Sequence, residues 1–434
     1  MSEHPQERAF LVGLRVPKQK NVLDTDVSLE ELGALADTAG LHVVGQTYQS
    51  LSRPNNATFI GKGKVEEIQH WLAELDSGLV LFDDELSPRH QRVLEKAFGQ
   101  GVKVLDRTAL ILDIFAQHAQ TREGSLQVEL AQYEYRLPRL TRQWTHLVRQ
   151  AGGVSGRGGA AGVGLRGPGE TQLESDRREV RRRISALRKD LETVRLHRAQ
   201  YRRRRQLNGI PLIALVGYTN AGKSTLLNRL SGSNLRTADQ LFATLDPTTR
   251  RVKLASIGEV LITDTVGFVQ KLPHSVIAAF RATLEEIAEA DLLLHVIDGS
   301  RFDAPEQAAI VENTLTSDLG ISGVPILRAI NKTDLAQSPE ERNAIDVMLR
   351  DQNAFEISAR HGFGIGALLD RIARELSVVH ARVTVRIPIS DGKTIARFRA
   401  CAHVNQESSN DQFLTATGDI SPRFLGEFHE FVTG

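Results

Sequence analysis

The segment that most constrains this 434-residue chain lies at residues 217–224, which read Gly-Tyr-Thr-Asn-Ala-Gly-Lys-Ser. This G-x-x-x-x-G-K-S spacing predicts a loop whose backbone N–H groups point at phosphate oxygens, with Lys223 on the β- and γ-phosphates and the Ser224 hydroxyl on Mg²⁺. A chance glycine loop would not also follow an apolar strand and open a leucine-rich helix. Both flanks are present, at residues 211–216 and 225–230. The chain is therefore expected to fold as an α/β protein with a mostly parallel sheet around this loop.

A second motif suited to a phosphate site begins at Asp264, which ends an apolar run and precedes Thr265, Val266 and Gly267. An acid at this place can hold Mg²⁺ through water. The Gly267 N–H can sense a γ-phosphate because no side chain blocks its approach. At this distance after a phosphate loop, the D-x-x-G pattern predicts a nucleoside triphosphate site.

A third motif, Asn-Lys-Thr-Asp at residues 331–334, follows another apolar run. The Asp334 carboxylate can accept hydrogen bonds from guanine N1–H and from its exocyclic amine. Adenine has an acceptor at N1 and would leave the carboxylate unpaired, which is unfavourable. Lys332 can lie along the base plane, while Ser358 and Ala359 can present backbone N–H groups to the guanine carbonyl. The pattern predicts GTP and GDP as ligands.

The alternation of apolar runs and helical patterns predicts four domains. We expect an N-terminal α/β domain at residues 1–120 and a helical hairpin with a glycine-rich loop at residues 121–207. Its two helices are expected at about residues 122–150 and 170–206. A nucleotide-binding α/β domain should follow at residues 208–378, and a small α+β domain at residues 379–434.

The composition of the chain bears on its cellular location. Cys401 is the single cysteine, so an internal disulfide is impossible and a reducing, cytoplasmic location is expected. Cys401 itself is expected to be a buried small side chain. The first residues are polar, which argues against a signal peptide, and no apolar run is long enough for a transmembrane segment. Peripheral association with a membrane stays open, and nothing in the sequence demands more than a monomer.

Charge is distributed unevenly along the chain. The formal net charge is +1, yet residues 136–205 hold 19 Arg and Lys against 6 Asp and Glu. Such a segment predicts contact with nucleic acid phosphates, with affinity that falls as salt rises. The alternative is a solvated helix held by pairs with Glu174, Glu179, Asp190 and Glu192, but six acids cannot balance nineteen cations.

Together these motifs resemble a Ras-like GTPase domain, and the likeness extends to the HflX family of Obg-related GTPases. Family-specific similarity lies in residues 110–115, 144–147, 164–174, 241–246 and 264–268. The resemblance implies a GTP-hydrolysing factor that contacts ribosomal RNA of the large subunit through the hairpin. It further implies that stalled ribosomes are split into subunits or rescued, under stress in some family members. The chain differs from the family pattern at Gly156–Gly162, a run that makes the loop longer. The RNA contacts that the family makes through this loop therefore apply to this chain less directly than the family's GTP site does.

The resemblance also implies that Thr244 is the switch threonine that joins Mg²⁺, whereas spacing alone leaves Thr244, Thr248 and Thr249 as alternatives. The full set of residues expected to contact the nucleotide or its Mg²⁺ is Gly217, Tyr218, Thr219, Asn220, Ala221, Gly222, Lys223, Ser224, Thr225, Phe242, Ala243, Thr244, Leu245, Asp246, Asp264, Thr265, Val266, Gly267, Asn331, Lys332, Thr333, Asp334, Ser358, Ala359 and Arg360.

The catalytic group is not assigned by the sequence. Ras-like enzymes place a water-orienting Gln directly after D-x-x-G, but here the residue is Phe268, which cannot hydrogen-bond water. Lys223, Thr244 and Gly267 are the expected transition-state contacts. Asn220 resembles the asparagine that coordinates K⁺ in some related GTPases, so K⁺ and the bound ribosome are the two candidate activators.

Two other functions remain open. The turn Gly-Lys-Gly-Lys at residues 61–64 precedes a helix and could bind an anion, although a plain strand-to-helix turn is favoured. Some members of the family are reported to bind ATP there, which would allow an ATP-driven RNA or ribosome remodelling enzyme. The second alternative is a GTP-dependent binding switch that acts on a non-ribosomal partner.

Overall fold

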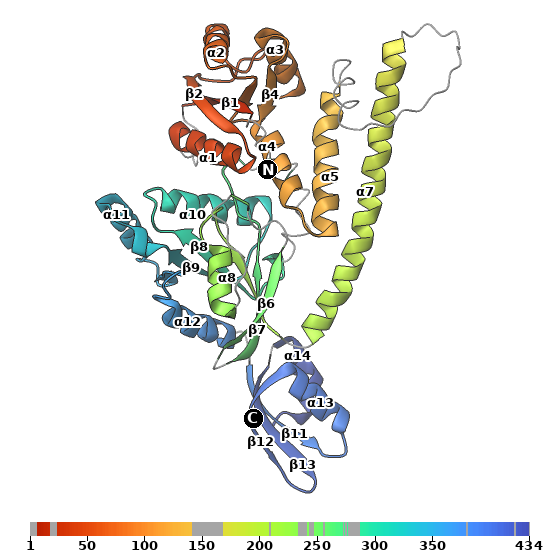
Figure 1. Ribbon diagram of the computed structural model, residues 1–434. Helices are drawn as coiled ribbons and strands as arrows, with labels where there is room; N and C mark the ends of the chain where they lie inside the picture. The colour runs from red at the N-terminus through yellow and green to blue at the C-terminus, as the bar shows by residue number, and fades with distance from the viewer. Residues whose placement is uncertain are drawn as a thin grey trace, which may run out of the picture. The chain divides into compact units, whose positions relative to one another are not determined.

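The computed structural model describes residues 7–17, 24–140, 168–207, 210–232, 241–242, 247–254, 257–271, 273, 276, 287–378, 381–420 and 422–433 (Figure 1). The chain forms two compact units. The first contains residues 1–20, 24–194 and 271–280, and the second contains residues 21–23, 195–270 and 281–434. The finer division into four domains stays a prediction.

The first unit is built on a four-stranded parallel sheet with strand order β2-β1-β3-β4. Apolar side chains from the sheet and from two of its helices form one core, which includes Phe10, Ile68, Phe82 and Leu94. The strands are β1 Arg8–Arg15, β2 His42–Ser50, β3 Leu79–Phe82 and β4 Lys103–Asp106, and the helices are α1 Thr25–Thr38, α2 Lys62–Glu74, α3 Pro88–Phe98 and α4 Arg107–His118. The alternation expected from the sequence is confirmed.

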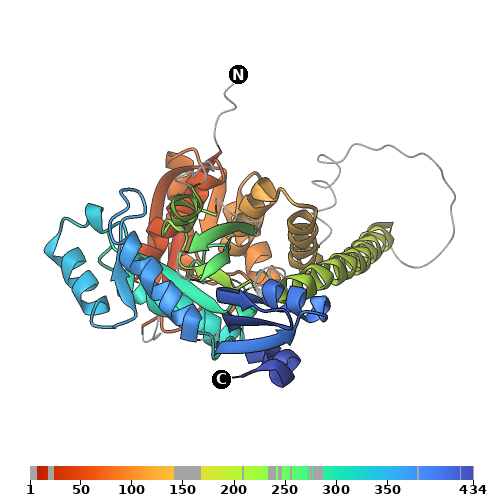
Figure 2. The same cartoon turned by 90° about the horizontal axis from the view of Figure 1, so that it is seen from below.

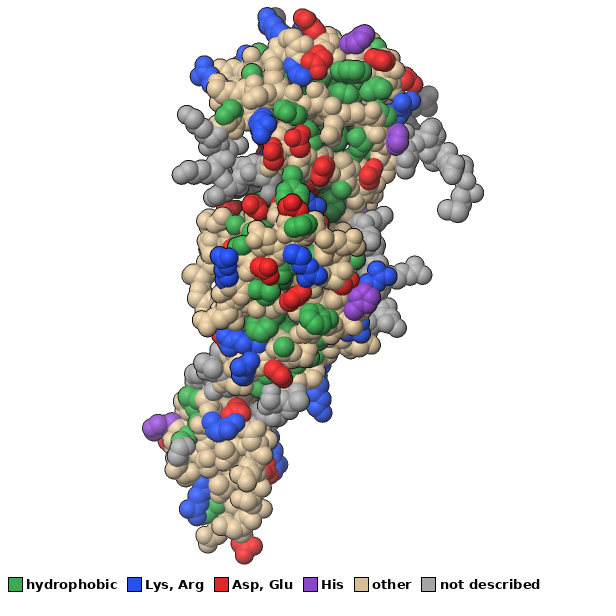
Figure 3. All heavy atoms as spheres, turned by 90° about the vertical axis from the view of Figure 1, so that its left-hand side faces the viewer, with side chains coloured by type: hydrophobic (Ala, Val, Ile, Leu, Met, Phe, Trp, Pro, Cys, Tyr) green, Lys and Arg blue, Asp and Glu red, His purple; other side chains and the backbone are tan. Residues whose placement is uncertain are grey.

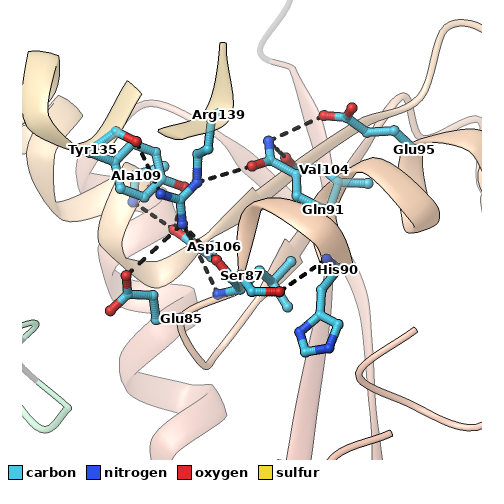
Figure 4. Close-up of polar contacts among 11 residues, drawn as sticks. Glu85, Ser87, His90, Gln91, Glu95, Val104, Asp106, Ala109, Tyr135 and Arg139 are labelled. Carbon is cyan, nitrogen blue, oxygen red and sulfur yellow. Dashed lines mark hydrogen bonds and ion pairs between the residues drawn. The ribbon is translucent and has the colours of Figure 1, made fainter. Parts of the chain in front are cut away.

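A buried polar network joins the carboxyl end of β4 to the helices that follow it (Figure 4). Asp106 is fully buried, and its Oδ1 accepts hydrogen bonds from Ala109 N at 2.9 Å and from the Tyr135 hydroxyl at 2.9 Å. Arg139 donates to Gln91 Oε1 and to Asp106 Oδ2. Burial, with the neighbouring Asp106 charge, raises the pKa of Tyr135. The phenol therefore remains a neutral donor that fixes the helix to the sheet.

A second buried network surrounds Arg107, which is 1% exposed. Its Nη1 lies 2.6 Å from Asp83 Oδ1, and its Nη2 pairs with Glu31. Asp83 also accepts from Ser28 Oγ at 2.7 Å. Burial alone would raise the pKa of Asp83, but the cations of Arg107 and Lys271 bring it below its usual value. Each carboxylate in this network therefore depends on its cation.

We expect Arg107→Met to destabilise the first unit by about 3–5 kcal/mol, because it leaves the Asp83 charge buried without this partner. Hydrogen exchange of the β3 and β4 amides measures the change as faster opening. Arg15→Met is the control, since the Arg15–Asp24 pair is about half exposed and should contribute about 1 kcal/mol or less. Equal effects of the two substitutions would contradict the role given to Arg107.

The helical hairpin is formed by α5 (Arg122–Arg136) and α7 (Pro168–Leu207), which lie side by side in Figures 1 and 2. Leu130 of α5 packs against Ile184 and Leu187 of α7. Two ion pairs flank this contact, Arg183 with Glu129 at 2.7 Å and Arg188 with Glu134 at 2.7 Å. Arg183 and Arg188 of α7 therefore pair with acids of α5, which neither the nucleic-acid interpretation nor the solvated-helix alternative had included.

The first hairpin helix is shorter than expected. It was predicted to run to residue 150, but α5 ends at Arg136 and a 3₁₀ turn, Leu137–Arg139, follows. Pro138 explains the difference, because proline has no N–H group to continue the hydrogen bonds of the α-helix. The glycine-rich loop and residues 144–147 lie outside the described residues.

The second unit contains a six-stranded sheet with order β10-β9-β8-β5-β7-β6, in which β6 alone is antiparallel to its neighbour. The strands β5 and β8 are wholly buried and form the centre of the core. The strands are β5 Leu212–Val216, β6 Thr248–Leu254, β7 Gly258–Asp264, β8 Leu292–Asp298, β9 Ile326–Asn331 and β10 Ala354–Glu356, and the helices are α8 Lys223–Ser231, α10 Ala304–Asn313, α11 Pro339–Met348 and α12 Ile365–Val378. A π-helical turn, Thr314–Asp318, extends α10.

The C-terminal segment of this unit is α+β, as expected. Its antiparallel sheet has the order β11-β13-β12, and Phe398 and Phe428 pack edge to face in its core. Cys401 is buried here, which raises the pKa of its thiol to about 11. The elements are β11 Ala381–Pro388, α13 Gly392–Cys401, β12 Ala402–Ser409, β13 Phe413–Ile420, α14 Pro422–Phe428 and a 3₁₀ turn, His429–Phe431. In the described part of the chain, we find no helix with the length and hydropathy needed to span a membrane.

Candidate nucleotide-binding site

The phosphate loop lies between the buried strand β5 and the first turn of α8, as the sequence predicted. Gly222 has φ of 93°, and a Cβ there would lie 2.3 Å from Asn331 Nδ2. Only glycine fits this position, because it must adopt left-handed geometry while the guanine motif packs against it. Asn220 also has a positive φ, of 59°. Both of these residues lie in the loop that connects β5 to α8.

Lys223 is folded over this loop. Its Nζ donates to the carbonyl oxygens of Gly217 at 3.1 Å and Tyr218 at 2.8 Å, and the side chain is 7% exposed. Burial lowers the pKa of Lys223 to about 8; Asp264 opposes this shift and the Lys332 cation adds to it. The lysine is therefore near its midpoint of ionisation at mildly alkaline pH.

Phosphate binding should consequently take up protons near pH 8, because the anion favours charged Lys223. In the empty protein the lysine is mostly charged below pH 8 and loses its proton above it. Nucleotide affinity should therefore be flat below about pH 7 and fall as pH rises through 8, by up to about tenfold per unit. Calorimetry of GDP binding at pH 8 in two buffers of different ionisation enthalpy measures the uptake. Zero uptake at pH 8 would contradict the lowered pKa.

Two oxygen ligands of the kind that Mg²⁺ prefers lie together beside Lys223. Ser224 Oγ lies 2.6 Å from Asp264 Oδ2, and Asp264 is 1% exposed. These two residues fit the metal role that the sequence assigned to them. The remaining expected ligand, Thr244, lies with Ala243, Leu245 and Asp246 outside the described residues.

The segment after Asp264 lies directly along the phosphate loop. Thr219 N donates to Phe268 O at 2.7 Å, and Phe268 N donates to Gly217 O at 3.1 Å. A Cβ on Gly267 would lie 2.8 Å from Thr219 Cα, so this close approach requires glycine. The backbone of Gly267 therefore reaches the loop, as expected for a group that senses the γ-phosphate.

Tyr218 adds a contact that the sequence did not reveal. Its hydroxyl accepts from Gln270 N at 2.7 Å, and its side chain is 7% exposed. The second residue of the phosphate loop thus holds the backbone two residues beyond Phe268. Phe268 itself is 3% exposed and supplies no polar side chain for water.

Tyr218→Phe should lower GTP turnover by about fivefold, because one deleted oxygen leaves the Gln270 N–H without its acceptor and frees the Gly267 segment. GDP affinity should change by less than about twofold, since GDP lacks the γ-phosphate that Gly267 senses. Single-turnover hydrolysis and GDP titration separate the two effects. Equal losses in both would show that Tyr218 supports the loop as a whole.

Asn331, the first residue of the motif expected to recognise guanine, is 2% exposed. Its Nδ2 donates to Ala221 O at 2.9 Å, and its Oδ1 accepts from Ala359 N at 2.8 Å. Asn331 therefore joins the phosphate loop to the turn expected to read the guanine carbonyl. Asp334 keeps a side-chain exposure of 26%, with His361 Nε2 at 3.4 Å. The Asp334 carboxylate thus remains accessible to a base.

Two residues outside the motifs support this arrangement. Arg229 of α8 donates from Nε to Ala359 O at 3.0 Å and from Nη2 to Arg360 O. Asp298, the last residue of β8, lies 2.8 Å from Lys332 Nζ through its Oδ2. An acid that ends an apolar strand beside the guanine motif was a visible signal for Asp298, whereas nothing in the sequence pointed to Arg229.

The chain is similar to several known proteins. Three family models match: "GTP-binding GTPase N-terminal" at residues 26–116, "GTP-binding GTPase Middle Region" at residues 118–205 and "50S ribosome-binding GTPase" at residues 212–332. The chain is 42% identical to the GTPase HflX of Caldanaerobacter subterraneus subsp. tengcongensis, over 98% of this chain and 94% of the relative. It is 43% identical to the GTPase HflX of Escherichia coli K12, over 92% and 90%. A crystal structure of a Sulfolobus solfataricus GTP-binding protein with GDP is 24% identical, with a TM-score of 0.42 over 85% of this chain and 98% of that one.

The phosphate loop, the Ser224–Asp264 pair and the Asn331 bridge have the arrangement expected of a site for a guanine nucleotide and Mg²⁺, and the relatives match along almost the whole chain. The chain belongs to the HflX family of GTPases and hydrolyses GTP.

Proposed function

We propose that this GTPase binds the large ribosomal subunit through its basic hairpin and uses GTP to split or rescue stalled ribosomes in the cytoplasm, acting as a monomer. The main support is the charge of α7 together with its mode of packing. Arg178, Arg181, Arg182 and Lys189 are exposed, while the helix is fixed to α5 by Leu187 and the Arg183–Glu129 pair. A rigid helix with free cations along it suits a surface of RNA phosphates.

Charge elsewhere supports the same assignment. On the face drawn in Figure 3, acidic and basic side chains are intermixed over the described residues. The basic excess of the sequence is instead concentrated in residues 136–205. The family model that covers residues 212–332 is named for GTPases that bind the 50S ribosome, which fits a partner rich in RNA.

Hydrolysis in this proposal depends on a group supplied from outside the pocket. When bound, Mg²⁺ would offset negative charge on the β- and γ-phosphates, held by Ser224 and Asp264. Lys223 would bind the phosphates, and the Gly267 N–H would orient the γ-phosphate. Since Phe268 is buried and apolar, the attacking water needs another partner. We propose that ribosome binding provides it or orders Thr244.

Potassium is a second candidate activator. Asn220 is exposed and has a positive φ within the phosphate loop. An exposed amide oxygen beside the phosphates could serve as a K⁺ ligand. The rate of GTP turnover in K⁺ and in Na⁺ at equal ionic strength tests this role. A faster rate in K⁺ that disappears in Asn220→Ala would support it, and equal rates of the native chain in the two salts would exclude it.

The ATP-driven alternative has less support. Gly61 N already donates to Gln49 Oε1 at 2.7 Å, and Lys64 pairs with Glu67 at 2.8 Å. The Gly61 N–H and the Lys64 ammonium, two groups of this motif that could bind an anion, thus already have partners within the first unit. ATP-dependent splitting that survives Asp334→Asn would nevertheless favour this alternative.

The experiment that tests the proposed function follows stalled ribosomes in sucrose gradients with the full chain and GTP. The proposal predicts conversion of the ribosomes to subunits. Loss of this conversion when a non-hydrolysable GTP analogue replaces GTP would show that hydrolysis is needed. Conversion with the analogue but not without nucleotide would show that GTP binding is enough. Intact ribosomes that bind the chain without splitting would contradict the splitting activity, whereas no binding to ribosomes would leave the non-ribosomal GTP-dependent binding switch as the better description.

A further inference from the structure

Lys332 of the guanine motif has a partner that none of the motifs includes. Lys332 has φ of 60°, and its side chain is 23% exposed. Its Nζ lies 2.8 Å from Asp298 Oδ2, and the Asp298 side chain is 11% exposed. A charge-assisted contact of this length in a largely buried place can fix the direction of a flexible lysine.

The position of Asp298 follows from the sheet. Asp298 ends β8 opposite Asn331 at the end of the parallel strand β9. Gly299 N donates to Asn331 O at 2.7 Å, which continues the pairing by one residue. Because the two strands end together, the acid of one and the lysine that follows the other come side by side.

The carboxylate is itself held in place. Asp298 Oδ1 accepts from Ser300 N at 3.1 Å and from Ser300 Oγ at 2.6 Å. One oxygen thus fixes the turn after β8, and the other remains directed at Lys332. Contacts within the protein therefore set the orientation of this carboxylate.

We propose that Asp298 is a positioning residue for guanine recognition, which holds Lys332 so that its methylene chain lies along the base plane. Asp298 acts through Lys332 and does not touch the reacting atoms. It should therefore strengthen GDP and GTP binding alike and leave the chemical step unchanged. The inference rests on the GTPase site and is independent of the ribosomal partner.

A double-mutant cycle between Asp298→Asn and Lys332→Ala tests this role in the full chain. Asparagine has the same shape and can still accept from Ser300, but its amide presents no charge to Lys332. Loss of one charge-assisted contact should weaken GDP binding by about five- to thirtyfold, with kcat for GTP within about twofold. On the Lys332→Ala background, Asp298→Asn should add less than about twofold.

Ser300→Ala is the matched control, because it removes a bond to the other oxygen of the same carboxylate. It should weaken GDP binding by less than about threefold. Three results of the binding and turnover measurements would overturn the proposal: an unchanged GDP affinity in Asp298→Asn, an equal loss of affinity on both backgrounds, or a fall in kcat larger than the loss of affinity. Thermal unfolding of each variant identifies any loss that reflects folding alone, and an affinity loss that merely follows lowered stability also overturns it.

Discussion

Asp334→Asn should change the base preference of the enzyme from guanine to xanthine. The carboxylate accepts from two guanine donors, N1–H and the exocyclic amine, whereas the asparagine amide would place a donor against that amine. The loss of a charged hydrogen bond together with this mismatch should weaken GTP binding by about a hundredfold or more. Xanthine has a carbonyl in place of the amine, so it can accept from the new amide, and XTP should become the better substrate.

Turnover with GTP and with XTP measures this exchange. Asp346→Asn is the control, because Asp346 is an exposed carboxylate on α11 of the same unit and should not alter preference. Retention of a strong GTP preference in Asp334→Asn would mean that another group reads the base. The accessible Asp334 and the buried, doubly bonded Asn331 predict the opposite.

Charge reversal on the hairpin should have the second large effect. Arg181→Glu with Arg182→Glu changes two exposed residues on α7 that lie next to the ion-paired Arg183. Each lost phosphate contact should reduce the number of counterions released on binding by close to one. The slope of the logarithm of the binding constant against the logarithm of the salt concentration should therefore fall in magnitude by about two. Affinity for purified large subunits at moderate salt should drop by about tenfold or more.

Sedimentation with large subunits at several salt concentrations measures both the affinity and its slope. A matched variant, Arg350→Glu with Lys393→Glu, makes the same change in net charge at exposed positions of the second unit. It should lose much less affinity. Equal losses in the two variants would show that net charge, and not the hairpin, governs binding.

Much of the nucleotide site could be predicted because each motif follows an apolar strand, and parallel strands bring their carboxyl ends to one edge. Lys223, Asp264, Asn331 and Ala359 meet there as expected. The alternating pattern of the first 120 residues likewise gave its parallel sheet. These features depend on local sequence and on general rules of sheet packing.

Other features could not be read in this way because they depend on which side chains meet across the fold. The Tyr218–Gln270 contact and the Asp298–Lys332 pair need the actual positions of neighbouring segments. The pairing of α7 cations with acids of α5 needs the register of two helices. Pro138 is a sequence signal for the end of α5 at Arg136, although the helical pattern of the sequence continues beyond it.

Phe268 cannot orient the attacking water, and the basic hairpin suits a surface of RNA. We therefore propose that the bound ribosome supplies or orders the group that GTP hydrolysis still needs. The most direct measurement is the rate of GTP turnover by the full chain with and without purified large subunits, with small subunits as the control. We predict a rise of about tenfold or more that is specific to large subunits. The same rate in all three conditions would contradict the claim.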